Sequence, residues 1–397
     1  MTPVLVFALA ALIMLLTRRR NDGGRGGFAA ELSAGLAAVE AAGFDPAAHG
    51  LVPSAELDPG RAGPPMRLLR RKELEALADS CLAGGWRAAE AYVAGAGADW
   101  DERWSRLDFL TRVAAERDEW LTDWEAAGTA PAAAATVRAR LLVQRAWEAR
   151  GSGFPAQIGP ERMAAFRTRL PAAYELARQA AEADGRDPGP WVVMITAARG
   201  MRVSRRKFRA LWAELVARAP HHVGGHWQAM QYWCAKWHGS DTLMLRFAVR
   251  AVREAPAGSP LPGLYLQALT ELELRHGPGG LPERRRHREL LPRVAAALDE
   301  VPPGNDQVPL LRHLLAHYAL LSRQPALALE QFRLIGPWCG ALPWSAAPNP
   351  VRAFDRARGL AATLAAGSGN EHPGAGTAGV GERPDTDRAA DGDRPGD

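Results

Sequence analysis

The sequence predicts an all-α protein, an α-solenoid of stacked helical hairpins behind an N-terminal hydrophobic helix. Apolar residues recur at helical spacing through residues 66–366. Proline-bearing turns recur at a hairpin interval, because Pro188, Pro220 and Pro256 lie 32 and 36 residues apart. The whole chain of 397 residues is 47% hydrophobic and 23% charged, which is typical of a globular protein.

The first expected element is a membrane anchor at residues 1–20. Residues 3–17 carry no charge and would form a helix about 22 Å long, which the flanking residues extend toward the hydrocarbon core. Three arginines, residues 18–20, follow this run, whereas a cleaved secretory signal has its positive charge in front. We therefore predict a single-pass protein of the cell membrane, with the N-terminus outside and the body cytoplasmic. An exported precursor and a buried core helix are the alternatives.

Composition divides the rest of the chain into three parts. Residues 21–65 are rich in glycine and proline and are expected to be a flexible linker with one short helix near residues 31–42. Residues 66–366 are expected to form the α-helical repeat domain. Residues 367–397 carry seven acidic and three basic residues, a net charge of −4, and almost no large apolar residue. We expect this last part to be a disordered acidic tail.

Within the body, the apolar positions follow the i, i+3, i+4, i+7 pattern of a helix with one buried face. The run from Trp191 to Thr196 is the only strand-like stretch, and the repeat register favours a helix there as well. The clearest stripes are Ala139, Leu142, Val143, Ala146 and Trp147; Phe208, Leu211, Trp212, Leu215 and Val216; and Leu311, Leu314, Leu315, Tyr318 and Ala319.

Two stretches resemble known repeat families. Residues 316–332, AHYALLSRQPALALEQF, look like a tetratricopeptide hairpin. Residues 233–248 are similar to a bacterial family of uncharacterised repeat-like proteins with a K-W-x-G-S turn. The resemblance spans roughly residues 137–335 and implies helix pairs of about 34 residues that bury their apolar faces by stacking. It implies no activity, since that bacterial family has none assigned.

Potential metal ligands gather between residues 221 and 238. Cys234 and His238 would share a helix face at i, i+4, a spacing that a metal can bridge. No carboxylate joins them, and the helix dipole favours a histidine at a helix end without any metal. We therefore expect no metal or cofactor, and an enzyme of hydrolytic type that uses this hairpin is the alternative. The cluster consists of His221, His222, His226, Cys234 and His238.

Tryptophans in the same hairpin suggest a partner groove. Trp233 and Trp237 are expected on one helix face, where with Trp227 and His238 they would form a groove, although packing between stacked hairpins is the favoured explanation. The sequence contains no phosphate-binding loop, nucleophile elbow or H-E-x-x-H motif. We therefore predict a membrane-tethered scaffold or adaptor that binds a protein or peptide, with no catalytic residue.

Basic residues raise the alternative of nucleic-acid binding. Of the 49 basic residues 46 are arginine, a bias typical of a GC-rich genome, so the excess over 44 acidic residues is weak evidence for a nucleic-acid partner. Arginine clusters at residues 67–72, 202–209 and 284–288 could contact anionic membrane headgroups or nucleic acid, or could simply be solvated faces. Three widely spaced cysteines do not indicate a disulfide framework. We favour membrane and protein partners over nucleic acid.

Overall fold

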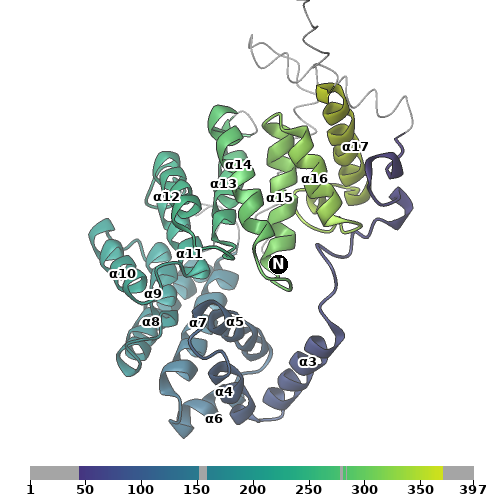
Figure 1. Ribbon diagram of the computed structural model, residues 1–397. Helices are drawn as coiled ribbons and strands as arrows, with labels where there is room; N and C mark the ends of the chain where they lie inside the picture. The colour runs from purple at the N-terminus through teal and green to yellow at the C-terminus, as the bar shows by residue number, and fades with distance from the viewer. Residues whose placement is uncertain (1–43, 152–158, 278–279, 283, 370–397) are drawn as a thin grey trace, which may run out of the picture.

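The computed structural model describes residues 44–151, 159–277, 280–282 and 284–369. Among these residues it contains fifteen α-helices, four short 3-10 helices and no β-strand (Figure 1), which confirms the all-α prediction. The predicted anchor at residues 3–17 and the predicted helix at residues 31–42 lie outside this range.

The helices follow one another along the chain with short connections, and the last one extends three residues beyond the expected end of the repeat domain. Their bounds are α3 (Leu68–Leu82), α4 (Trp86–Ala94), α5 (Trp100–Glu116), α6 (Glu119–Ala127), α7 (Pro131–Arg150), α8 (Pro160–Ala183), α9 (Gly189–Gly200), α10 (Arg205–Arg218), α11 (Val223–Trp233), α12 (Asp241–Glu254), α13 (Leu264–His276), α14 (Arg284–Asp299), α15 (Gln307–Leu321), α16 (Pro325–Ile335) and α17 (Pro350–Gly369).

Local sequence signals begin several of these helices. The side chains of Asp99, Ser204 and Ser240 each accept a backbone N–H three residues later, and so cap α5, α10 and α12. Helices α7, α8 and α16 begin with a proline, whose missing N–H would have no partner in the first turn.

Each helix packs mainly on its neighbours in sequence. Helix α9 contacts α7, α8, α10 and α11, and α13 contacts α11, α12 and α15. The core is accordingly a row of four apolar clusters in chain order, centred on α5–α7, α8–α11, α12–α15 and α15–α17. Figure 1 shows these helices arranged along a curved path.

The strand-like run Trp191–Thr196 lies inside α9, as expected. Residues 192–198 of this helix are all buried, because helices pack against it from several sides. The run lacks a polar face for this reason, and its continuous apolar sequence resembles a buried strand.

Residues 44–63 are bound to the C-terminal helices, which differs from the flexible linker expected at residues 21–65. Leu51 and Leu57 are buried in the cluster formed by α15–α17. The Asp58 backbone pairs with Pro337 and Cys339 on both sides, at N···O distances of 2.8 and 2.9 Å. From there the chain crosses to α3 at the other end of the array (Figure 1).

Buried polar side chains hold this segment in place. The Arg358 guanidinium, buried in α17, donates to the Val52 carbonyl at 2.7 Å and to the Ser54 hydroxyl at 3.0 Å. His313 Nε2 lies 2.9 Å from the Ala62 carbonyl oxygen, and His313 Nδ1 accepts the Trp344 indole N–H at 3.0 Å. The glycine and proline content of residues 44–63 correctly indicates an irregular backbone. Whether that backbone is flexible or held in place depends on residues some 300 positions later in the sequence, such as Arg358.

Candidate functional site

The histidine-rich hairpin does not have the geometry expected from its sequence. Helix α11 ends at Trp233, so Cys234 and His238 share no helix face, and neither do Trp233 and Trp237. A tight turn follows, in which the His238 and Ser240 amides donate to the carbonyls of Tyr232 and Trp233. Gly239 permits this turn, because a Cβ atom there would lie 1.8 Å from the Trp233 carbonyl oxygen. Among the described residues no three His, Cys, Asp or Glu side chains are placed to hold a metal ion.

Two histidines of this hairpin are buried and neutral. His222 caps α11, because its Nδ1 accepts the Gly225 N–H at 3.1 Å, and His226 Nδ1 lies 3.0 Å from the His222 carbonyl oxygen. Burial lowers the pKa of His222 to about 3 and that of His226 to about 4. Burial also raises the pKa of the Cys234 thiol to about 12. These groups are therefore uncharged at neutral pH and packed inside the protein.

The structure distributes the expected groove residues among different surroundings. Trp227 packs against the apolar cluster of α12–α15. Trp233 stands edge-on to Phe208 and Tyr232, with ring centroids 5.4 and 5.3 Å apart. These two indoles are packing residues, whereas Trp237 reaches a different set of side chains.

Trp237 belongs to a group of aromatic and arginine side chains that we call the Arg199 cluster: Trp147, Arg150, Phe166, Arg199 and Trp237. The Arg199 guanidinium carbon lies 4.8 Å from the Trp147 ring centroid and 5.4 Å from that of Trp237. The two indoles meet edge to face at 5.5 Å. Arg150 lies 5.6 to 5.8 Å from the rings of Trp147, Trp237 and Phe166. Both cations are within the range of cation–π attraction.

Four separate elements bring the Arg199 cluster together. Trp147 and Arg150 lie in the last turn of α7, Phe166 in α8, and Arg199 near the end of α9. Trp237 comes from the turn after α11. His238 holds that turn against α9, because its Nε2 lies 3.0 Å from the Arg199 carbonyl oxygen.

Among the described residues no carboxylate forms an ion pair or hydrogen bond with Arg199 or Arg150, although Glu271 is near enough to favour the charged form of Arg199. Arg199 donates to the Gln228 amide oxygen at 3.2 Å, and Arg150 donates to the Gly151 carbonyl at 3.0 Å. Burial lowers the pKa of Arg199 to about 10, and it also lowers the pKa of Arg150. Both groups remain cationic at neutral pH.

Three buried N–H groups of the same cluster lack an acceptor within the described part of the chain: Trp147 Nε1, Arg199 Nε and Trp237 Nε1. A buried donor without an acceptor costs about 1 to 3 kcal/mol. Two cations and three free donors between aromatic rings form an environment that an anionic acceptor would stabilise.

Only the Trp237 side of this cluster can be predicted from the sequence. Trp147 and Trp237 are 90 residues apart, and the sequence places Trp147 only in an apolar helical stripe. Arg150 and Arg199 follow such stripes as ordinary basic residues near helix ends. No nearby residue in the sequence distinguishes these two arginines. Whether a carboxylate pairs with them is decided only when the helices pack.

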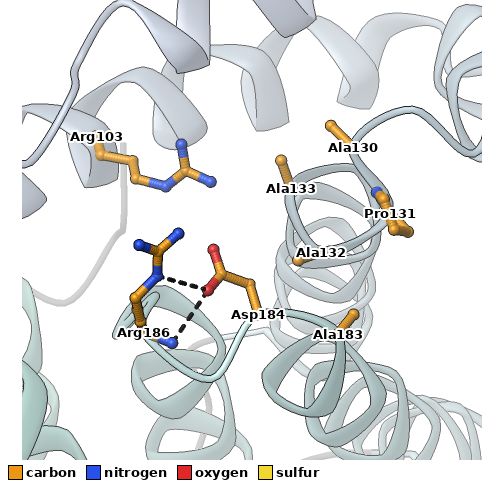
Figure 2. Close-up of a pocket in the computed structure, with 8 residues that line it drawn as sticks. All are labelled: Arg103, Ala130, Pro131, Ala132, Ala133, Ala183, Asp184 and Arg186. Atoms are coloured by element: carbon orange, nitrogen blue, oxygen red, sulfur yellow. Dashed lines mark hydrogen bonds and ion pairs between the residues drawn. The ribbon is translucent and has the colours of Figure 1, made fainter.

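A shallow hollow of about 320 Å³ lies between α5, α7 and the end of α8 (Figure 2). Its charged groups already have partners, because Arg103 pairs with Asp187 at 2.8 Å and Arg186 lies 3.7 Å from Asp184. The rest of its lining is alanine and proline, so the hollow offers little for a ligand to recognise.

A second polar group is sealed inside the protein between α13 and α15. The Glu273 carboxylate accepts the Tyr318 hydroxyl at 3.0 Å, and His317 Nε2 lies 3.0 and 3.1 Å from its two oxygens. The side chains of His317 and Glu273 are only 2% and 1% exposed. The combination resembles an acid–base site in composition, but a substrate cannot reach it, so we assign it a role in stability.

The three arginine clusters lie on three different helices. Residues 67–72 begin α3, residues 205–209 begin α10, and residues 284–288 begin α14. Arg205 is engaged by the His238 carbonyl at 2.7 Å, and Lys207 lies over the Tyr174 ring.

Comparisons with known proteins add no relative. No family model, no curated protein and no solved structure matches this chain. In the part of the chain that the structure describes, no helix is long and apolar enough to cross a bilayer.

Proposed function

We propose that this protein is a membrane-tethered helical-repeat scaffold that binds an acidic protein or peptide through the Arg199 cluster. One observation carries the proposal: two guanidinium groups and three unpaired N–H donors lie between aromatic rings with no carboxylate partner among the described residues. A carboxylate from an aspartate, a glutamate or a chain end supplies the missing acceptor.

The chemistry of the cluster suits a peptide more than a free inorganic anion. Arginine binds a carboxylate through two parallel hydrogen bonds, and each charge-assisted bond contributes about 1.5 to 3 kcal/mol. The partly buried Trp147 and Trp237 rings add apolar surface that can contact the residues beside that carboxylate. Aromatic and arginine side chains together are typical of the residues that dominate binding energy at protein interfaces.

The order of helix contacts supports a repeat architecture. Contacts link α7 to α9, α9 to α11, α11 to α13 and α13 to α15, while the helices between them pack on these neighbours. We infer a tetratricopeptide-like α-solenoid in which the ends of α7 and α9 and the turn after α11 form one binding edge. Catalysis is not part of the proposal, because His222 and His226 are buried as neutral rings.

Replacing Arg150 with methionine should weaken binding of a fluorescein-labelled oligoglutamate peptide about 10- to 100-fold, because a charge-assisted hydrogen bond is lost. Arg150 is half-buried and, among the described residues, donates only to a backbone carbonyl, so the fold should tolerate the change. Fluorescence anisotropy measures the affinity, and oligoserine and oligolysine peptides test whether the charge matters.

Arg218→Met is the matched control. Arg218 also stacks on an indole, 4.6 Å from the Trp191 ring centroid, but it already pairs with Glu214 at 2.8 Å. This variant should bind the peptide as the parent does. Equal losses in both variants, or no loss with Arg150→Met, would contradict the proposed site.

The proposed tether makes a separate prediction about residues 3–17. Deleting them should move the protein from the membrane fraction to the supernatant, because no other apolar run of that length occurs in the sequence. Protease added to intact cells should leave the parent body uncut. Recovery of a shortened form outside the cell would favour export.

A further inference from the structure

We propose that the first turn of α3 is a lipid-binding tip that enters the interface of an anionic membrane. Met66, Leu68 and Leu69 are 42%, 57% and 72% exposed, and they form the densest group of exposed large apolar side chains in the described residues. The inference does not depend on the anchor proposed for residues 3–17.

Helix α3 is held by its second half and leaves its first turn uncovered. Leu74 and Leu77 are half-buried and Cys81 is fully buried, and the helix packs on α4 and α5. Arg70 fixes the helix further, because it donates to the Tyr92 hydroxyl at 3.2 Å. Helix α3 lies at the edge of the molecule (Figure 1), and its packing supports the exposed leucines of the first turn.

Basic side chains surround these leucines. Arg67 and Lys72 are exposed and form no ion pair within the described residues, and Arg71 has only the exposed Glu75 at 3.5 Å. Residues 60–72 contain no acidic residue, and the exposed Glu73 and Glu75 follow in the next turn of α3. Apolar side chains next to an excess of cations are complementary to anionic headgroups above acyl chains.

The positions of these apolar side chains favour binding to a lipid surface over packing against a second helix. Leu68 and Leu69 are consecutive, so they point about 100° apart around the helix and do not form the i, i+4 stripe that a partner helix needs. With Met66 they surround the helix end. A fluid acyl interface accepts this shape, whereas a packed protein interface needs a matching cavity.

The test places a fluorescent label on the tip in the full-length protein. Leu69→Cys is labelled with the environment-sensitive dye NBD and added to phosphatidylcholine vesicles with or without phosphatidylglycerol. The native thiols should remain unlabelled, because Cys81, Cys234 and Cys339 are buried and burial raises the pKa of each to about 11 or 12. Leu334→Cys on α16 is the matched control, since Leu334 is 52% exposed.

We expect the label at residue 69 to shift to the blue on anionic vesicles and to be quenched by lipids with brominated acyl chains, while the label at residue 334 does neither. Changing Arg67 or Lys72 to glutamine should lower the apparent affinity for anionic vesicles about five-fold each. A label at residue 69 that stays in water, equal quenching at both positions, or a blue shift that needs only more protein and no lipid would overturn the proposal. The last result would indicate a second copy of the chain.

Vesicle flotation separates this proposal from the anchor. An anchor at residues 3–17 predicts that both labelled proteins float with and without anionic lipid. Insertion of α3 is reported by the label at residue 69 alone. Flotation can therefore contradict the anchor, and the label at residue 69 can contradict membrane insertion of α3, independently of each other.

Discussion

Lowering the pH from 7 to 5 should destabilise the folded protein by about 6 kcal/mol, because three buried histidines resist protonation in the fold, each contributing about 2 kcal/mol. Burial lowers the pKa of His222 to about 3 and those of His226 and His313 to about 4. In the unfolded chain each ring takes up a proton near pH 6.5. Stability is therefore complete above that pH and falls as the pH drops from 6.5 toward 4.

The hydrogen bonds of these histidines explain why protonation destabilises the fold. His222 Nδ1 accepts the Gly225 N–H at the start of α11, and His313 Nδ1 accepts the Trp344 indole N–H. A proton on either nitrogen would remove the acceptor and leave a buried charge. Asp101 acts in the opposite direction because burial raises its pKa, but its side chain is about half exposed, so solvent screens the effect.

Urea unfolding followed by circular dichroism at a series of pH values measures this dependence. His222→Asn is the matched variant, because an asparagine oxygen caps a helix well and does not titrate. We expect it to remove about a third of the loss between pH 7 and 5, since one of three similar groups is gone. An unfolding midpoint that is constant from pH 7 to 5 would show that these rings are protonated in the fold.

Replacing Glu273 with leucine should destabilise the protein by about 3 to 5 kcal/mol, because it removes the buried carboxylate and leaves its two hydrogen-bond donors without an acceptor. His317 and the Tyr318 hydroxyl would lose the carboxylate that accepts from them at 3.0 Å. Glu273→Gln should cost less, since one amide oxygen remains as an acceptor.

A triple variant distinguishes a missing partner from a packing defect. Changing His317 to leucine and Tyr318 to phenylalanine beside Glu273→Leu removes the stranded polar groups and should recover much of the stability. Glu254→Leu is the surface control: its ion pair with Arg250 is largely exposed, so the loss should stay below about 1 kcal/mol. If Glu273→Leu and Glu254→Leu unfold at similar urea concentrations, the buried hydrogen bonds of Glu273 contribute little to stability.

Secondary structure was predictable because its signals are local. Apolar spacing and proline turns identified helices such as α9, α10 and α15, since each signal acts inside one or two turns. The expectation that Trp233 and Trp237 share one helix face was wrong for an equally local reason. Gly239 allows the chain to fold back on the Trp233 carbonyl, and this ends α11 five residues before a continuous helix through His238 would end.

The sequence alone determined that this chain is helical and which faces of several helices are apolar, because both follow from periods of a few residues. Only the tertiary structure decided that residues 44–63 bind the C-terminal helices, that Arg199 lies between Trp147 and Trp237, and that Glu273 meets His317. These contacts join segments tens to hundreds of residues apart. Their energy depends on burial and on which partners are missing, and neither quantity exists until the helices have packed.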